Sequence, residues 1–158
     1  MDKLKYLANT AILHLQRGER LNKMVSYTMA SDDSVVLHVA ELKNSDGLQK
    51  AIRFLDGLRK LNNKLRTEEK FIRTKEVAMF SWAVTQFAPF LKDLGFEIHS
   101  DNSHPLWNEL ETDYREMAKR NRVLKRYVGI TPSLAVMQKE VFLNHPRFQP
   151  STPERPNL

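Results

Sequence analysis

The stretch from Lys75 to Ser100 has the sequence KEVAMFSWAVTQFAPFLKDLGFEIHS and carries the clearest structural signals of the chain. Residues 76–81 form a short apolar run, and the large side chains of residues 82–94 follow with helical spacing. A turn at Gly95 leads into a second apolar segment. Short apolar segments on both sides of one helix are typical of a sheet whose two faces are covered. The stretch therefore predicts strand, helix, glycine turn and strand in an α/β fold.

Length and composition indicate one folded domain. The chain has 158 residues, and 41% hydrophobic residues with 8 Phe, 4 Tyr and 2 Trp argue against extensive disorder. No apolar run approaches the roughly 20 residues that span a bilayer, and the amino terminus lacks the features of a signal peptide. We therefore expect a cytoplasmic protein without a membrane partner. The absence of cysteine excludes disulfides, thiolate metal sites and cysteine nucleophiles.

The charge distribution favours anionic partners. The formal net charge is +6, which suits nucleic acid, phosphate groups or an acidic surface without selecting among them. Basic residues are concentrated between Lys43 and Lys75, where few acidic residues offset them. The basic residues of this segment are Lys43, Lys50, Arg53, Arg59, Lys60, Lys64, Arg66, Lys70, Arg73 and Lys75.

The first half of the chain predicts a helix, a hairpin and a long helix. Apolar residues at helical spacing favour an amphipathic helix from Asp2 to Arg17, which Gly18 would end. Alternating apolar residues in 25–29 and 35–39 predict a β-hairpin. A long helix follows the loop around Gly47 and ends near Asn62 and Asn63 or one turn later. Its expected core-facing stripe is Leu48, Ile52, Leu55, Leu58, Leu61 and Leu65.

The second half predicts a strand and three further helices. Residues 71–81 favour a strand, and the helix that follows should kink at Pro89 or start near Ala88, because proline removes a helical hydrogen bond. After a polar loop, helices are expected from Pro105 to Val128 and from Ser133 to Leu143. These elements place a single α/β domain at residues 1–143. Residues 144–158 hold four of the seven prolines and predict an extended tail.

The element order from Ser34 to Ser100 resembles a known family. It is strand, polar loop, long helix, strand, shorter helix, glycine turn and strand, and this order is similar to the second half of a GNAT-type N-acetyltransferase. The last helix of that family commonly ends in a Lys/Asp-Leu-Gly-Phe turn, which here is the segment 92–97. The resemblance implies a GNAT-like mixed sheet with flanking helices, to which this chain adds C-terminal helices.

The resemblance also implies a cofactor, acetyl-CoA or another acyl-CoA, and no metal. In the family, a glycine-containing loop binds the coenzyme pyrophosphate through backbone N–H groups at a helix N-terminus. Only Gly47 of the aligned segment 44–49 matches the family's glycine pattern. The implied cofactor-binding residues are Leu42, Lys43, Asn44, Ser45 and Gly47. The implied acceptor cleft is bordered by Glu41, Ser81 and Trp82, with Glu41 as the nearest candidate base.

Three positions depart from the family pattern. Asp46 would place a carboxylate where the pyrophosphate belongs, and like charges repel. Val84 and Leu91 stand where the family often has an Asn and a Tyr that can act as an acid. The catalytic residues are therefore unassigned. The leading hypothesis is a divergent acyl-CoA-binding or N-acyltransferase-like protein that has lost part of this catalytic equipment.

Other polar residues suggest weaker alternatives. His99 and His104 enclose a polar loop that could bind a metal or form an acid/base pair, although a solvated loop is the simpler interpretation. Trp82 could line a pocket or fill the core. His14 and His38 are expected to be packing or surface residues, and His145 belongs to the predicted tail.

A non-enzymatic function is the main alternative. Residues 114–143 resemble a helix-turn-helix, with a basic helix, a turn at Gly129 and a short second helix. That second helix would present Ser133, Gln138 and Lys139 to bases. The protein would then be a nucleic-acid-binding or protein-binding module that uses its basic helices, and the residues leave this possibility open. The oligomeric state is not predicted.

Overall fold

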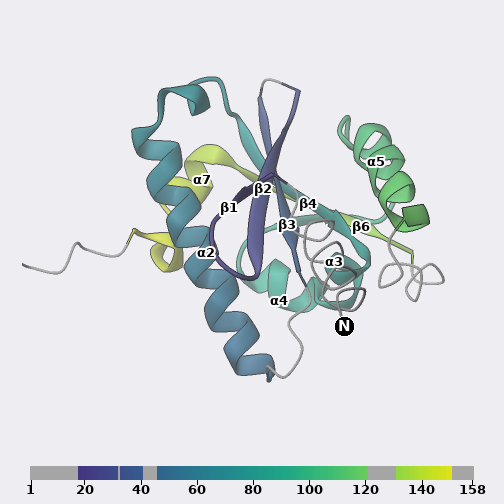
Figure 1. Cartoon of the computed structure of the whole chain (residues 1–158), viewed down its shortest axis with the longest axis horizontal. Coiled ribbons are helices and arrows are strands. Elements are labelled where there is room, and N and C mark those ends of the chain that lie inside the picture. Colours follow the sequence, from purple (N-terminus) through teal and green to yellow (C-terminus); the bar gives the residue numbers. More distant parts are fainter. Residues whose placement is uncertain (1–17, 32, 41–45, 121–130, 151–158) are drawn as a thin grey trace, which may run out of the picture.

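A computed structural model describes residues 18–31, 33–40, 46–120 and 131–150. The chain forms a mixed six-stranded sheet in the order β1-β2-β3-β4-β6-β5, with helices packed against it (Figure 1). The α/β class predicted from the sequence is confirmed. The strands are β1 (Glu19–Arg20), β2 (Val25–Ala30), β3 (Ser34–Val39), β4 (Glu76–Ser81), β5 (Glu97–His99) and β6 (Ser133–Gln138). The helices are α2 (Gly47–Thr67), α3 (Trp82–Gln86), α4 (Ala88–Asp93), α5 (Trp107–Arg120) and α7 (Lys139–Leu143), with 3₁₀ turns η1 (Glu69–Phe71) and η2 (Pro146–Phe148).

One pair of neighbouring strands in the sheet is parallel. Strands β2 and β3 form the predicted hairpin, with Tyr27 opposite Leu37. The long helix α2 then crosses over and returns the chain as β4, parallel to β3. Strand β6 comes last in sequence but lies between β4 and β5, antiparallel to both. The centre of the sheet therefore combines residues from both halves of the chain.

The strand β6 corrects two predictions. Residues 133–143 were expected to form one helix, but residues 133–138 are a strand and only 139–143 are helical. All residues of β6 except Gln138 are buried, because the strand lies between β4 and β5 and both its faces are covered. A short continuous apolar run does not distinguish such a strand from a buried helix. The predicted helix-turn-helix is therefore wrong, since residues 133–138 of its recognition helix are a strand.

The larger core lies between the sheet and the α2, α4 and α7 helices. From α2 it receives Phe54, Leu58, Leu61 and Leu65. Gly57 of the same helix lies so close to the sheet that a Cβ there would be 2.8 Å from the Val25 side chain. The predicted stripe of α2 holds only in its later part. Two of its expected core residues are exposed, Leu48 at 72% and Ile52 at 54%.

A second, smaller core lies on the opposite face, under α5. Trp107 and Leu110 of this helix pack on the sheet with Phe80 of β4. The Phe80 ring meets the Trp107 ring edge-on at a centroid distance of 4.9 Å, and the Tyr114 ring at 5.6 Å. Helices α2 and α5 thus lie on opposite sides of the sheet (Figure 1).

The helix after β4 is interrupted as the proline predicts. Helix α3 ends at Gln86, and α4 begins at Ala88 with Pro89 in its first turn, where the missing N–H has no helical partner to lose. Helix α4 then ends in a turn at Gly95, whose φ of +99° favours glycine. The N–H of Phe96 donates to the carbonyl of Leu91 across this turn. Both local predictions are confirmed.

The predicted tail begins too early. Phe148 is fully buried in the larger core, where its ring lies 4.9 Å from that of Phe142. His145 stacks on Phe148, and its Nε2 is 2.7 Å from the carbonyl oxygen of Leu94. The tail was predicted from proline content alone. Proline content does not show that one aromatic residue of the segment, Phe148, is buried. The folded part of the chain therefore extends to at least Phe148.

Three further predictions lie outside the described residues or extend beyond them. The helix from Asp2 to Arg17 and the end of the tail, residues 151–158, are not described. The helix predicted from Pro105 to Val128 is described as α5 from Trp107 to Arg120. No helix among the described ranges is long and apolar enough to cross a membrane.

Candidate functional site

The two parallel strands of the sheet separate at their carboxyl ends. Their pairing runs as far as Leu37 of β3 and Met79 of β4. Beyond these residues β3 stays paired with β2 through Val39, and β4 stays paired with β6 through Ser81. A cavity of about 430 Å³ opens where the strands diverge. Ligands of open α/β sheets commonly bind at this position, beyond the carboxyl ends of parallel strands.

The cavity wall is mainly apolar and comes from both faces of the sheet. Its size lies within the range of about 300–1,000 Å³ that is usual for small-molecule sites. Helix α5 reaches it from the side opposite to α2, so elements far apart in sequence enclose one space. The described residues of the wall are Met24, Leu37, His38, Val39, Gly47, Lys50, Ala51, Phe54, Met79, Phe80, Ser81, Trp82, Ala83, Phe87, Phe90, Leu91, Tyr114 and Met117.

Three predicted site residues meet at this cavity. Gly47 begins α2, whereas Ser81 and Trp82 lie at the junction of β4 and α3, yet all three line the same space. The other predicted site residues fall in a segment outside the described residues. They are Glu41, Leu42, Lys43, Asn44 and Ser45.

The N-terminus of α2 already carries an anion of its own. The Oδ1 of Asp46 accepts a hydrogen bond of 2.7 Å from the backbone N–H of Gln49. The carbonyl of Asp46 accepts a second bond, at 3.0 Å, from the N–H of Lys50. This is a regular side-chain N-cap. Consequently, the carboxylate neutralises the helix end that would otherwise attract an anionic ligand.

The end of β4 holds two hydroxyl groups at the cavity. The Oγ of Ser81 accepts a hydrogen bond from the N–H of Ala83 and caps α3. The hydroxyl of Tyr114 accepts a bond of 3.3 Å from the N–H of Trp82. Burial raises the pKa of Tyr114 above its ordinary value of 10.0, so the phenol is protonated at neutral pH. Both groups are thus neutral polar contacts on an apolar wall.

Sequence reasoning missed His38, Lys50 and Tyr114 as wall residues. His38 was expected to be a packing or surface residue, but it lines the cavity with its Nε2 2.7 Å from the Oγ1 of Thr28. Its place at the end of a strand was the one available signal, since ligands meet strand ends in such sheets. Tyr114 gave no signal, because only the packing of α5 brings it to β4.

Val84 and Leu91, which stand where the family often has an Asn and a Tyr, carry no acid or base group. Val84 is fully buried in the larger core, and Leu91 contributes apolar surface to the cavity. Of the described wall residues, His38 is the one that carries an imidazole, a side chain that commonly serves as a base. The arrangement is therefore better equipped to hold an apolar group than to activate one.

A pair of histidines, His99 and His104, lies away from this cavity, toward the amino end of β4. The rings of His99 and His104 come together, with centroids 5.4 Å apart. The Nε2 of His104 is 3.4 Å from Glu76, whereas the Nε2 of His99 is 3.2 Å from Glu97 without hydrogen-bond geometry. Within the described part of the chain, no group of three or more such side chains could hold a metal ion. We assign no site to this cluster.

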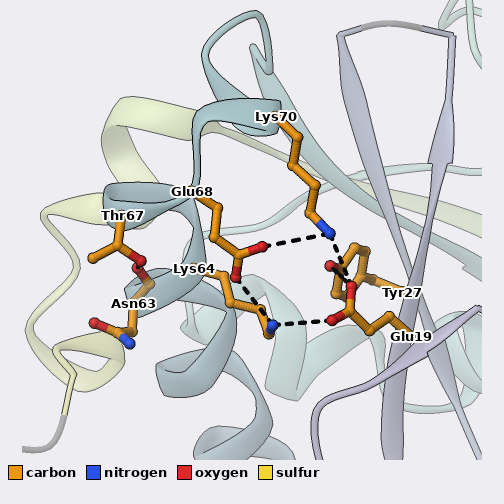
Figure 2. A network of polar contacts seen from close by, with 7 residues as sticks. All are labelled: Glu19, Tyr27, Asn63, Lys64, Thr67, Glu68 and Lys70. Carbon is orange, nitrogen blue, oxygen red and sulfur yellow. Dashed lines mark hydrogen bonds and ion pairs between the residues drawn. The ribbon is translucent and has the colours of Figure 1, made fainter.

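Part of the basic segment is neutralised in a network that joins α2 and η1 to the sheet edge (Figure 2). Glu19 of β1 pairs with Lys64 at 3.1 Å and with Lys70 at 2.9 Å. Glu68 pairs with the same two lysines, at 3.0 Å and 3.4 Å. The Tyr27 hydroxyl donates to Glu19. Because the charges balance, the network fastens elements together and does not present a ligand site.

Comparison of the chain with models of protein families, with curated proteins and with solved structures gives no match. The geometry of the cavity and its chemistry are therefore the basis for the function proposed below.

Proposed function

We propose that this chain binds an acyl-CoA-type thioester in the cavity between β3 and β4, as a divergent acyl-CoA-binding or N-acyltransferase-like protein. One observation carries the proposal: two adjacent parallel strands diverge at their carboxyl ends around an apolar cavity of about 430 Å³. An elongated ligand with an apolar arm can enter between the separated strands and bury that arm.

The order of elements supports a GNAT-like scaffold for this function. The strand, long helix, strand, short helix and strand implied by the resemblance correspond to β3, α2, β4, α3 with α4, and β5. The glycine turn expected between the last two elements lies at Gly95. Fold similarity alone does not establish an activity, so the proposal depends on the cavity.

Binding is better supported than transfer. An acyl transfer to an amine requires a group that accepts the proton of the amine. His38 is the described wall residue with suitable chemistry, and Tyr114 supplies a neutral hydroxyl near the end of β4. We therefore propose thioester binding as the primary activity, with His38 as the candidate base if transfer occurs.

A fluorescence titration tests the proposal directly. Trp82 lines the cavity, while Trp107 packs in the smaller core. The Trp107→Phe protein thus retains one tryptophan, which reports on the cavity. We expect octanoyl-CoA to change its emission saturably at about 0.15 M salt, where general attraction to a basic surface is largely screened.

Two matched variants locate the binding. A Cβ at Gly47 meets no atom within 4 Å, so Gly47→Phe should fold normally while placing a ring at the cavity. Gln49→Phe adds the same ring to an exposed position on the same helix turn that is not among the wall residues. Loss of binding in Gly47→Phe but not in Gln49→Phe supports the proposal. Equal binding by both variants, or no binding by the parent protein, contradicts it.

The nucleic-acid alternative now depends on charge alone. Residues 133–138 of its predicted recognition helix form β6, a buried strand that lies between β4 and β5. The remaining support is the set of basic residues on α2 and at the end of α5. Such a surface attracts polyanions without selecting a sequence.

A further inference from the structure

We propose that the cavity recognises the acyl-pantetheine arm of a thioester and that the nucleotide diphosphate contributes no affinity. This inference rests on the function proposed above and narrows its substrate class. The relevant ligand chemistry is an acyl chain joined through sulfur to a pantetheine arm, whether or not a nucleotide is attached.

The capped N-terminus of α2 is a poor site for a phosphate group. A helix N-terminus binds phosphate through its unpaired N–H groups and the positive end of its dipole. Here one of these groups, the N–H of Gln49, already donates to the Asp46 carboxylate. The carboxylate also places a full negative charge beside the cavity wall at Gly47. A diphosphate at this position would lose hydrogen bonds and meet a like charge.

The charge of the cavity wall also disfavours a ligand with several phosphate groups. Among the described residues of the wall, Lys50 is the one lysine or arginine. A coenzyme A molecule carries three phosphate groups, and a single ammonium group is a poor match for them. Buried charges are favourable only when they are paired and hydrogen-bonded. The wall therefore favours the part of the ligand that carries no phosphate.

The cavity wall offers apolar surface and a few neutral polar groups. Its apolar surface comes from aromatic and aliphatic side chains such as Phe54, Phe90 and Met79, which suit a hydrocarbon chain. The amide groups of a pantetheine arm need only a few neutral partners. Ser81 and the Tyr114 hydroxyl supply neutral polar atoms at the end of β4. A long apolar wall with a few neutral polar groups matches an acylated pantetheine arm, which has a hydrocarbon chain and two amide groups.

The test compares two thioesters with the same acyl chain, S-octanoyl-pantetheine and octanoyl-CoA, at about 0.15 M salt. The Trp107→Phe protein is titrated with each, and Trp82 emission is the readout. We expect the two dissociation constants to differ by less than about fivefold, because the nucleotide meets no complementary charge. If octanoyl-CoA binds about fivefold tighter or more, the inference is overturned while the proposed function stands. If neither thioester binds, both are overturned.

A variant of the helix cap provides an independent check. Asp46→Asn keeps an N-capping side chain and removes its charge, so the fold should be retained. Octanoyl-CoA should then bind at least about threefold more tightly, because the repulsion is gone. The affinity for S-octanoyl-pantetheine should not change. Unchanged or weaker binding of octanoyl-CoA by Asp46→Asn overturns the role assigned to the carboxylate, and circular dichroism verifies that the helix is intact.

Discussion

Glu19 and Lys70 are 51 residues apart in sequence and form an ion pair of 2.9 Å between the edge strand β1 and the turn after α2. Because β1 has only two residues, side-chain contacts of this kind supplement its few backbone hydrogen bonds. The pKa of Glu19 falls from 4.5 to about 2, first because the Tyr27 hydroxyl donates to it and then because Lys70 and Lys64 do so. The carboxylate is therefore the common centre of the network in Figure 2.

The Glu19 network should stabilise the protein in a pH-dependent way. The pKa of Glu19 is lower in the folded state, so its contribution is complete above the unfolded value of 4.5 and disappears as the pH falls toward 2. Glu19→Gln should thus lower the free energy of unfolding at pH 7 by up to about 1 kcal/mol, a modest value because the pairs are partly exposed. Urea unfolding at pH 7 and pH 3 measures this difference, which should shrink at the lower pH.

The control for this prediction is Glu116→Gln, which removes the exposed pair of Glu116 with Lys119. It should leave stability unchanged at both pH values. A destabilisation by Glu19→Gln that does not decrease at pH 3 would mean that packing of β1, and not the charge of Glu19, is responsible.

Replacement of Gly57 should disturb the contact of α2 with the sheet. A Cβ at this position would lie 2.8 Å from the Cβ and Cγ2 of Val25, which is closer than side chains approach. Gly57→Ala should lower the free energy of unfolding by about 1–3 kcal/mol, although alanine is the better helix former. Adding Val25→Ala should recover part of the loss in a double-mutant cycle. If Gly57→Ala is as stable as the parent protein, α2 does not lie as close to Val25 as described above.

Phe148 should act as an anchor of the C-terminal segment. Its side chain is fully buried between the core and His145, so Phe148→Ala should lower the free energy of unfolding by about 3–5 kcal/mol. The exposed Val141 of α7 is the matched position, and Val141→Ala should have little effect. Chemical denaturation compares the two variants. If Phe148→Ala and Val141→Ala are equally stable, residues 144–150 belong to the tail that the sequence predicts.

Nucleic acid should bind weakly and without a specific site. We expect a labelled DNA duplex to show no saturable binding at about 0.2 M salt, because phosphate contacts alone are lost as salt rises. Neutralising Arg120 together with Arg122 and Arg126 should leave octanoyl-CoA binding unchanged. A tight complex whose salt slope falls in this triple variant would instead support the nucleic-acid alternative.

Several elements were predictable from local chemistry. Alternation determines the hairpin of β2 and β3, and the break between α3 and α4 follows from the ring of Pro89. The turn at Gly95 requires a backbone conformation that other residues rarely adopt. In each case the cause lies within a few residues along the chain.

The candidate site was only partly predictable. Ser81, Trp82 and Gly47 were predicted from the family resemblance, and the structure brings these three together at one cavity. His38 and Tyr114 could not be assigned, because their side chains reach the cavity through the packing of separate elements. From the sequence, nothing distinguishes Tyr114 from any other tyrosine on an amphipathic helix, so its contact with the end of β4 could not be predicted.

The sequence by itself determined the α/β class, the hairpin, the long helix and the turns, because backbone geometry and side-chain periodicity act over short distances. Only the tertiary structure decided that residues 133–138 form a strand inside the sheet, since a short apolar run satisfies a helix or a strand equally well until both its faces are covered. The tertiary structure also decided that β3 and β4 part beyond Leu37 and Met79. A cavity is a relation between segments distant in sequence, so no local pattern encodes it.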